Sequence, residues 1–255
     1  MKILLMGEYS NVHATLAEGL RKLGHEVTVL SNGDFWKNYP RDINMVRKPG
    51  KLGGILYLIK LYTIVHKLRG YDIVQLINPM FLELKAERIF PIYRYLRKHN
   101  RKVVLAAFGM DYYWVSVCCQ DKPLRYSDFN IGDELRTNAD ALKERKDWLG
   151  TAKERLNRMI AEDCDGIIAG LYEYWVCYQP HFPQKTTFIP YPIHTYTQSY
   201  QDRDKGAASV DIPKRPSQKL KLFIGINKTR SEYKGTDIML KAAQAIAEKY
   251  PEKVE

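Results

Sequence analysis

Short apolar segments alternate with longer helical segments along the first three quarters of the chain, and this alternation is what most restricts its fold. Segments with the length and apolar content of buried strands lie at residues 2–6, 26–30, 72–77, 102–107, 166–169 and 186–189. Strands separated by helices predict parallel pairing, because a parallel neighbour needs a crossover connection of a dozen or more residues. Continuous apolar strands also fit a sheet that helices cover on both faces. We therefore expect residues 1–194 to form one α/β domain with a doubly wound parallel sheet.

The segments between these strands predict the helices. The first helix is expected to begin after Asn11, whose side chain can cap it, and to end at Gly24. Further helices are expected over 55–68, 82–99 and most of 132–164, with a helical turn at 171–178.

The character of the chain changes after residue 194. Residues 195–218 are polar and contain Gly206, Pro213 and Pro216, which is typical of an interdomain linker. A strand is then expected at 220–225 and a helix at 237–250. One strand and one helix cannot bury a core, so residues 219–255 are expected to be the start of an incomplete second domain.

Positive charge is concentrated in one quarter of the chain. The net charge is +11, and residues 41–102 contain 14 Lys/Arg and 4 Asp/Glu. Nucleic acid, anionic lipid and phosphorylated substrates all fit such a segment, as does a merely solvated basic surface. Hydrophobic residues make up 45% of the chain, so a globular protein rather than disorder is expected.

Cysteine usage and hydropathy bear on the compartment. The four cysteines form no Cys-x-x-Cys pair, and adjacent Cys118 and Cys119 are a poor basis for a disulfide framework. Reduced thiols in a cytoplasm fit best. The apolar N-terminus is too short for a signal-peptide core, and the apolar run 55–65 is interrupted by Lys60 and is shorter than the ~20 residues of a membrane span. A cytoplasmic protein is expected.

Several catalytic motifs are missing from the sequence. The first loop has Gly7 but no G-x-G-x-x-G, which disfavours a dinucleotide oxidoreductase. Walker A and G-x-S-x-G motifs are absent, and the six histidines show no metal-ligand spacing. No metal and no cofactor are expected.

Ligands of an open parallel sheet bind beyond the carboxyl ends of its strands, which singles out the loops after each predicted strand. The ligand-binding candidates in these loops are Gly7, Ser10, Asn11, Asn78 and Gly109. Glycine and small polar residues there allow a ligand to approach the backbone closely, although turn formation and helix capping explain them as well.

Asp111 is the candidate catalytic residue. It follows a predicted buried strand and precedes Tyr112, Tyr113 and Trp114. Its carboxylate can orient a sugar hydroxyl or a reacting group, and the aromatic rings can stack on a sugar face. The alternative is an aspartate that caps a turn beside core aromatic residues.

Arg230 and Lys234 form a candidate anion-binding site. They lie between a predicted strand and a predicted helix, in the segment GINKTRSEYKG. Two cations beside a helix N-terminus suit a diphosphate that gains negative charge as it leaves. The alternative is a pair of solvated loop cations.

The segment 55–68 is apolar except for a narrow stripe of Lys60, Thr63 and Lys67, with His66 beside it. Such a helix commonly packs on the sheet. An alternative is that residues 47–69 lie on an anionic membrane surface, assisted by Arg47, Lys48, Lys51 and Arg69.

Taken in order, these segments resemble the GT-B glycosyltransferases, and within them glycosyltransferase family 4. KILLMG followed by HATLAEGLRKLGHEVTVLS is similar to that family's opening strand–helix–strand, and LAAFGMD is similar to its aromatic- or His-Gly-x-Asp pattern. CDGIIAG with TTFIPYPIH, and LFIGINKTRSEYKGTDIMLKAAQ, resemble the end of the first domain and the start of the donor domain.

The resemblance implies two Rossmann-like domains and a retaining, metal-independent transfer from a nucleotide-sugar donor to a glycan or lipid-linked acceptor. It also implies that Gly7, Ser10, Asn11, Asn78 and Gly109 are acceptor-binding residues and that Arg230 and Lys234 bind the donor phosphates. Lys234 matches the family's Lys-Gly lysine, which holds the donor diphosphate together with an arginine. Ile226 occupies the place of its arginine, so Arg230 is the best substitute and Lys228 a second candidate. The family's paired glutamates belong to a later part of the donor domain, so this polypeptide alone is expected to be inactive.

Transfer at the inner face of the plasma membrane, in cell-surface polysaccharide biosynthesis, is the function expected. No nucleic-acid partner is expected, because no nucleic-acid-binding motif accompanies the charge. The alternatives are another GT-B enzyme, such as a nucleotide-sugar 2-epimerase, and a non-enzymatic basic binding protein.

Overall fold

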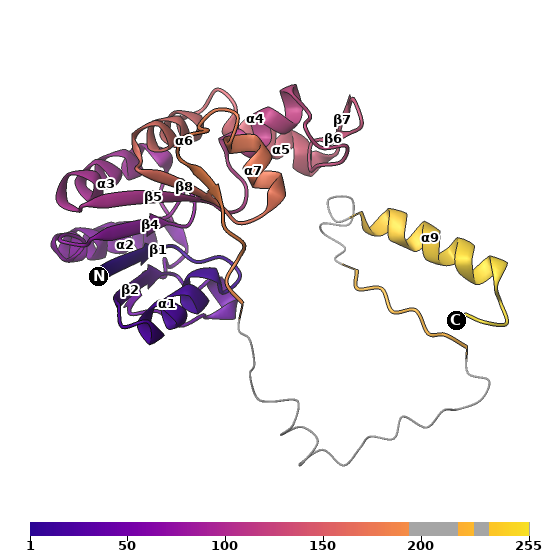
Figure 1. Cartoon of the computed structure of the whole chain (residues 1–255), viewed down its shortest axis with the longest axis horizontal. Coiled ribbons are helices and arrows are strands. Elements are labelled where there is room, and N and C mark those ends of the chain that lie inside the picture. Colours follow the sequence, from indigo (N-terminus) through magenta and orange to yellow (C-terminus); the bar gives the residue numbers. More distant parts are fainter. Residues whose placement is uncertain (194–218, 227–234, 255) are drawn as a thin grey trace, which may run out of the picture. The chain divides into compact units, whose positions relative to one another are not determined.

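The structure is a computed structural model that describes residues 1–193, 219–226 and 235–254 (Figure 1). The chain divides into two compact units. The first contains Met1–Thr137 and Ala141–His194, and the remaining residues belong to the second. Each unit is described by itself.

A seven-stranded parallel sheet forms the centre of the first unit, as the sequence predicts. Its strands run in the order β3-β2-β1-β4-β5-β8-β9 (Figure 1). They are β1 (Lys2–Met6), β2 (Glu26–Ser31), β3 (Ile43–Asn44), β4 (Ile73–Leu76), β5 (Lys102–Ala107), β8 (Gly166–Ala169) and β9 (Thr186–Phe188). The short strand β3 was not predicted. With helices between its strands, the unit has a Rossmann-like α/β fold, which confirms the predicted fold class at this level.

The helices differ from the predicted ones mainly at their ends and in the middle of the chain. They are α1 (Val12–Lys22), α2 (Gly50–Ile64), α3 (Ala86–His99), α4 (Tyr112–Gln120), α5 (Ala139–Trp148), α6 (Ala152–Asp163) and α7 (Tyr172–Tyr178), with 3-10 turns at Phe35–Lys37 and Val65–Lys67. The predicted helix over 82–99 begins only at Ala86, and α4 was not predicted as a helix at all.

The predicted helical region 132–164 was wrong as a single element. It opens with the second strand of a small antiparallel hairpin, β6 (Asn130–Ile131) and β7 (Glu134–Leu135), and continues as two helices. Gly150, at φ 71°, ends α5, and the Thr151 hydroxyl begins α6 by accepting a hydrogen bond from Lys153 N at 3.2 Å. A left-handed glycine followed by a threonine cap stops one helix and starts another.

The core fills both faces of the sheet. Alternate residues of a strand point to opposite faces, and β1 shows this directly. Ile3 and Leu5 pack with Ala17 of α1 and with β2, whereas Leu4 and Met6 join the larger cluster that α2, α3, α4, α6 and α7 complete. The carboxyl edge of the sheet is thereby held in place from both sides.

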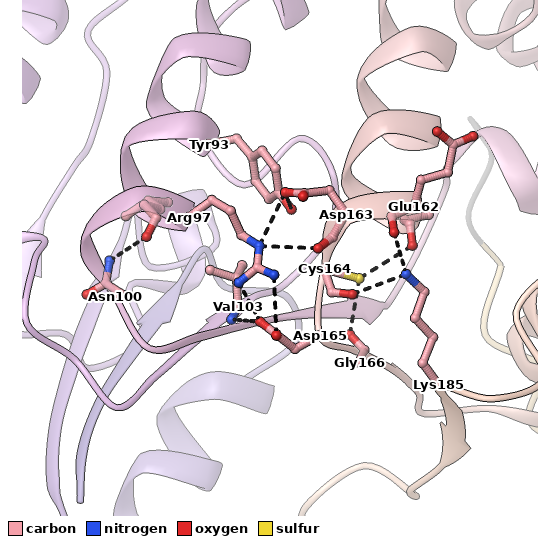
Figure 2. A network of polar contacts seen from close by, with 12 residues as sticks. Tyr93, Arg97, Asn100, Val103, Glu162, Asp163, Cys164, Asp165, Gly166 and Lys185 are labelled. Carbon is pink, nitrogen blue, oxygen red and sulfur yellow. Dashed lines mark hydrogen bonds and ion pairs between the residues drawn. The ribbon is translucent and has the colours of Figure 1, made fainter.

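A polar network ties α3 and α6 to the amino edge of the sheet, and Figure 2 shows its side chains. The Arg97 guanidinium donates to both carboxylate oxygens of Asp165, at 2.8 and 3.3 Å, and to the backbone oxygen of Asp163 at 3.2 Å. Asp165 also accepts from Val103 N at 2.8 Å, and Lys185 Nζ donates to Cys164 O at 3.1 Å. Because these groups lie where β5 and β8 begin, the network stabilises the edge opposite to the predicted site.

The described part of the second unit contains one helix, α9 (Thr236–Lys249), close to the predicted bounds. The strand predicted at 220–225 was wrong: its only described pairing is a single parallel bridge between Leu220 and Val254. A strand needs a neighbouring strand to satisfy its backbone, and the described residues supply one such contact, Leu220 N to Lys253 O at 2.7 Å. The predicted linker, 195–218, lies outside the described residues.

Two findings bear on the predicted compartment. The four cysteines are free thiols, and three of them are buried. Among the described residues, no helix has the length and apolar content needed to cross a membrane.

Candidate functional site: two cavities at the carboxyl edge of the sheet

The loops that follow β1, β2 and β4 enclose a cavity of about 270 Å³, here called the inner cavity. These three strands are neighbours in the sheet, so their carboxyl ends meet at one place. The lining residues from the strand ends are Gly7, Glu8, Tyr9, Ser31, Asn32 and Ile77. The cavity thus lies where parallel α/β sheets bind ligands.

Gly7 can only be glycine in this loop. Its φ is +87°, and a Cβ atom there would lie 2.2 Å from Ile77 Cγ2. Its N–H donates to Leu30 O at 2.8 Å, which fixes the turn that directs the chain into α1. Close packing of the β1 and β4 ends therefore explains Gly7, and Gly7 also lines the inner cavity.

The sequence predicts the wrong capping residue for α1. Asn11 occupies the N-cap position, but its side chain makes no capping hydrogen bond. The buried Glu8 carboxylate instead accepts from His13 N at 3.2 Å and from Ala14 N at 2.8 Å. A carboxylate at a helix N-terminus satisfies unpaired N–H groups and interacts favourably with the helix dipole. Burial nevertheless raises the pKa of Glu8, because desolvation outweighs these hydrogen bonds.

His13 is a neutral core residue beneath this loop. Burial lowers its pKa to about 4. Its Nδ1 lies 2.8 Å from the carbonyl oxygen of Gly7, which can only accept, so Nδ1 carries the proton. Nε2 then accepts from the Gln75 amide at 3.2 Å. The imidazole holds the loop after β1 to β4 and is fully buried.

Ser10 and Asn11 form the outward bend of the same loop, with φ of 51° and 68°. Ser10 N donates to the Asp34 carboxylate at 2.9 Å, which links this loop to the one after β2. Ser10 is exposed, whereas Asn11 is half-buried. Neither residue lines the inner cavity, so the predicted acceptor contacts at Ser10 and Asn11 stay predictions.

Asn78 and Gly109 lie in the loops that follow β4 and β5. The Asn78 amide donates to Phe108 O at 3.3 Å and to Met110 O at 3.1 Å, and its oxygen accepts from Met80 N at 2.9 Å. This buried side chain is therefore engaged in joining the ends of β4 and β5. Gly109, at φ +93°, lies beside the Tyr9 ring. Contact of either residue with an acceptor stays a prediction.

A larger cavity of about 760 Å³, here called the outer cavity, adjoins the inner one and shares Phe35, Met80, Glu83 and Leu84 with it. It is lined by the N-terminal ends of α2, α3 and α6, at Gly50, Ala86 and Ala152. Its charged lining residues are the cations Arg47, Lys48, Lys85 and Lys153 and the acids Glu83, Glu87 and Asp147.

Two of these acids are already engaged by neighbours. Glu83 accepts from the Asn32 amide at 2.5 Å and from Arg47 N at 3.1 Å. Asp147 pairs with Lys153 at 3.5 Å. Helix N-termini carry partial positive charge, and the cations outnumber the acids, so the potential in the outer cavity favours a negatively charged group.

Asp111 lies away from both cavities and is fully buried. It caps α4 by accepting from Trp114 N at 2.9 Å, and it accepts from the Tyr178 hydroxyl at 2.8 Å. Burial raises its pKa to about 6. The structure therefore gives Asp111 the capping role that was its alternative explanation, and a catalytic role stays a prediction.

The aromatic residues after Asp111 are also buried. Tyr112, Tyr113 and Trp114 belong to the core cluster, where Tyr113 packs on Tyr178 at 4.6 Å between ring centroids. Their burial agrees with the alternative explanation, core aromatic residues beside a capping aspartate, and stacking on a sugar stays a prediction.

No family model and no characterised protein matches this chain. The family resemblance therefore depends on the order of the sequence motifs alone. Arg230 and Lys234, which carry the donor side of that resemblance, lie outside the described residues.

Several residues of the two cavities were not chosen as candidates from the sequence. Glu8 and Asn32 lie in the loops after the first two predicted strands, where ligands were expected, but neither was selected. Glu83 carries no motif, and Lys85 and Lys153 are ordinary surface lysines in sequence terms. Glu8 is the one with a usable signal, since an acid shortly before a helix is a capping residue. The described residues contain no cluster of His, Cys, Asp or Glu that could hold a metal ion.

Proposed function

We propose that this protein transfers a sugar, with retention of configuration, from a nucleotide-sugar donor to an acceptor, and that its first unit binds the acceptor. The observation that carries the proposal is the inner cavity, which lies at the carboxyl ends of β1, β4 and β2 in a Rossmann-like sheet. Such an edge is the usual ligand site of parallel α/β sheets. The motif order that resembles GT-B glycosyltransferases supports the chemistry.

The acceptor in this proposal carries a phosphate or diphosphate group, such as that of a lipid-linked glycan precursor. The outer cavity supports this choice because three helix N-termini and four cations line it. Its volume of about 760 Å³ falls in the range of small-molecule sites. The anionic group would lie near Lys85, and the sugar would extend toward Asn32 and Glu8 in the inner cavity.

The donor belongs to the second unit in this proposal. Arg230 and Lys234 would neutralise the charge that develops on the departing nucleoside diphosphate, which lowers the barrier without a metal ion. The glycosidic bond to the diphosphate breaks, a new bond to the acceptor hydroxyl forms on the same face, and the hydroxyl proton leaves with the diphosphate. Positioning of donor and acceptor supplies the remaining rate enhancement. The reaction would take place at the inner face of the plasma membrane.

Binding followed by product analysis tests this function. The longest protein that the gene encodes is screened with nucleotide sugars by thermal shift, since a ligand that binds the folded state raises the melting temperature. The sugar that binds is then supplied in labelled form with phosphorylated lipid acceptors. A labelled lipid product supports the proposal. A labelled epimer of the nucleotide sugar indicates the 2-epimerase alternative, and absence of any nucleotide-sugar binding overturns both.

A further inference from the structure

Helix α2 exposes an apolar face that the first unit leaves uncovered. Its large exposed side chains are Leu52 (69% exposed), Ile55 (55%), Leu56 (50%), Ile59 (54%) and Tyr62 (62%). At 3.6 residues per turn they occupy about 120° of the helix circumference. The opposite face, with Gly53, Tyr57 and Leu61, is buried against the domain. A helix that is apolar on both faces is normally buried all round, so the exposed half needs a partner.

One polar side chain of α2 lies within the arc of this face. Thr63 falls between Ile59 and Leu56 around the helix, but its hydroxyl donates to Lys60 O at 2.7 Å and is satisfied within the helix. Lys51 and Lys60 lie at opposite edges of the exposed apolar face. Long lysine side chains at such edges can keep their ammonium groups in water while their stems cover an apolar surface.

The charge around α2 identifies the kind of partner. Residues 43–71 contain no Asp or Glu. Every lysine and arginine in that range is exposed: Arg47, Lys48, Lys51, Lys60, Lys67 and Arg69. An apolar stripe bordered by cations alone is the pattern of a helix that lies in the interface of an anionic membrane. A protein partner with an apolar surface would not require cations around this face.

We propose that α2 docks the protein on an anionic lipid bilayer, with Leu52, Ile55, Leu56, Ile59 and Tyr62 inserted among the acyl chains. This membrane face does not depend on the proposed transferase activity. It would bring the outer cavity to the lipid headgroups, because Arg47, Lys48 and Gly50, at the start of α2, line that cavity. Tyr57 holds α2 beside the outer cavity, because its hydroxyl accepts from the backbone N of Glu83 at 3.3 Å, and Glu83 lines that cavity.

Vesicle sedimentation of the whole chain tests the docking. We expect it to sediment with phosphatidylcholine vesicles that contain phosphatidylglycerol, less so at high salt, and little with phosphatidylcholine alone. The double variant L52Q/I59Q should bind the anionic vesicles at least about tenfold more weakly, because two inserted apolar side chains are lost. Both side chains are exposed, so the variant should keep the melting temperature and circular dichroism of the wild type.

A matched control and three contrary outcomes complete the test. Leu23→Gln removes another exposed leucine, 75% exposed at the end of α1, and should leave vesicle binding unchanged. Wild-type protein that sediments with neither kind of vesicle would overturn the proposal, as would equal binding by L52Q/I59Q. A dimer that L52Q/I59Q dissociates, without vesicle binding by the wild type, would assign the face to a second copy and also overturn it.

Discussion

At the scale of single residues, the buried ionisable groups of the first unit serve its architecture. Asp111 begins α4, Glu8 begins α1, and His13 joins the loop after β1 to β4. Each is desolvated, and each has its polar atoms engaged by backbone, amide or hydroxyl groups. Burial raises the pKa of Asp111 to about 6 and lowers that of His13 to about 4. These shifts make stability depend on pH in predictable directions.

Asp111→Asn should become more stable relative to the wild type as the pH rises. The folded-state pKa of about 6 lies above the ordinary aspartate value of 3.8, so between pH 4 and 6 the folded wild type binds a proton that the unfolded chain releases. Its stability therefore falls across that window. Asparagine does not titrate and can still accept from Trp114 N. The free energy of unfolding of the variant minus that of the wild type should increase by on the order of 2 to 3 kcal/mol from pH 4 to pH 7. Urea denaturation at the two pH values measures it.

Asp133→Asn removes a carboxylate from an exposed position in the turn between β6 and β7, and it serves as the matched control at the same two pH values. If the two variants changed in stability with pH by the same amount, the Asp111 carboxylate would not be desolvated as the structure has it.

At the scale of elements, the sequence predicts the helices and strands whose pattern of apolar residues is local. The unit β1-α1-β2 was predicted because an apolar run, an amphipathic helix and a β-branched run follow one another within thirty residues. Helix α4 was not, because Tyr112–Cys118 is buried on all sides and shows no 3.6-residue alternation. The outer cavity was also unpredictable, since Lys85 and Lys153 come from different helices that only the tertiary fold brings together.

The polar network at the amino edge gives an element-scale prediction. Arg97→Lys keeps the charge but loses the paired hydrogen bonds to Asp165 and the bond to Asp163 O. Because the guanidinium is about one-third exposed, solvent screening limits the expected loss of stability to about 1 kcal/mol. Chemical denaturation monitored by circular dichroism measures it. Arg94→Lys, on an exposed position of the same helix, should change little. Equal effects of the two substitutions would mean that the network does not anchor α3.

At the scale of the whole molecule, the proposed function divides between the two units. The acceptor side uses the carboxyl edge of the first sheet, where loops from β1, β2 and β4 and the N-termini of α2, α3 and α6 meet. The donor side uses Arg230 and Lys234. The membrane face on α2 adds a third surface next to the outer cavity. A protein built in this way should allow donor and acceptor binding to be impaired separately.

Substitutions in the two units should therefore change different Michaelis constants when the longest protein that the gene encodes is used in the transferase assay. Arg230→Ala with Lys234→Ala should raise the KM for the nucleotide sugar about tenfold or more, because two cations that hold the diphosphate are lost. Lys85→Ala, at the N-terminal end of α3, should raise only the KM for the phosphorylated acceptor, by several-fold, since one cation of the outer cavity is removed. Lys98→Ala removes the same charge from the C-terminal end of α3, near the opposite edge of the sheet, and should change neither constant. If Lys85→Ala and Lys98→Ala raised the acceptor KM equally, the effect would come from net charge, and the outer cavity would lose its role as the acceptor site.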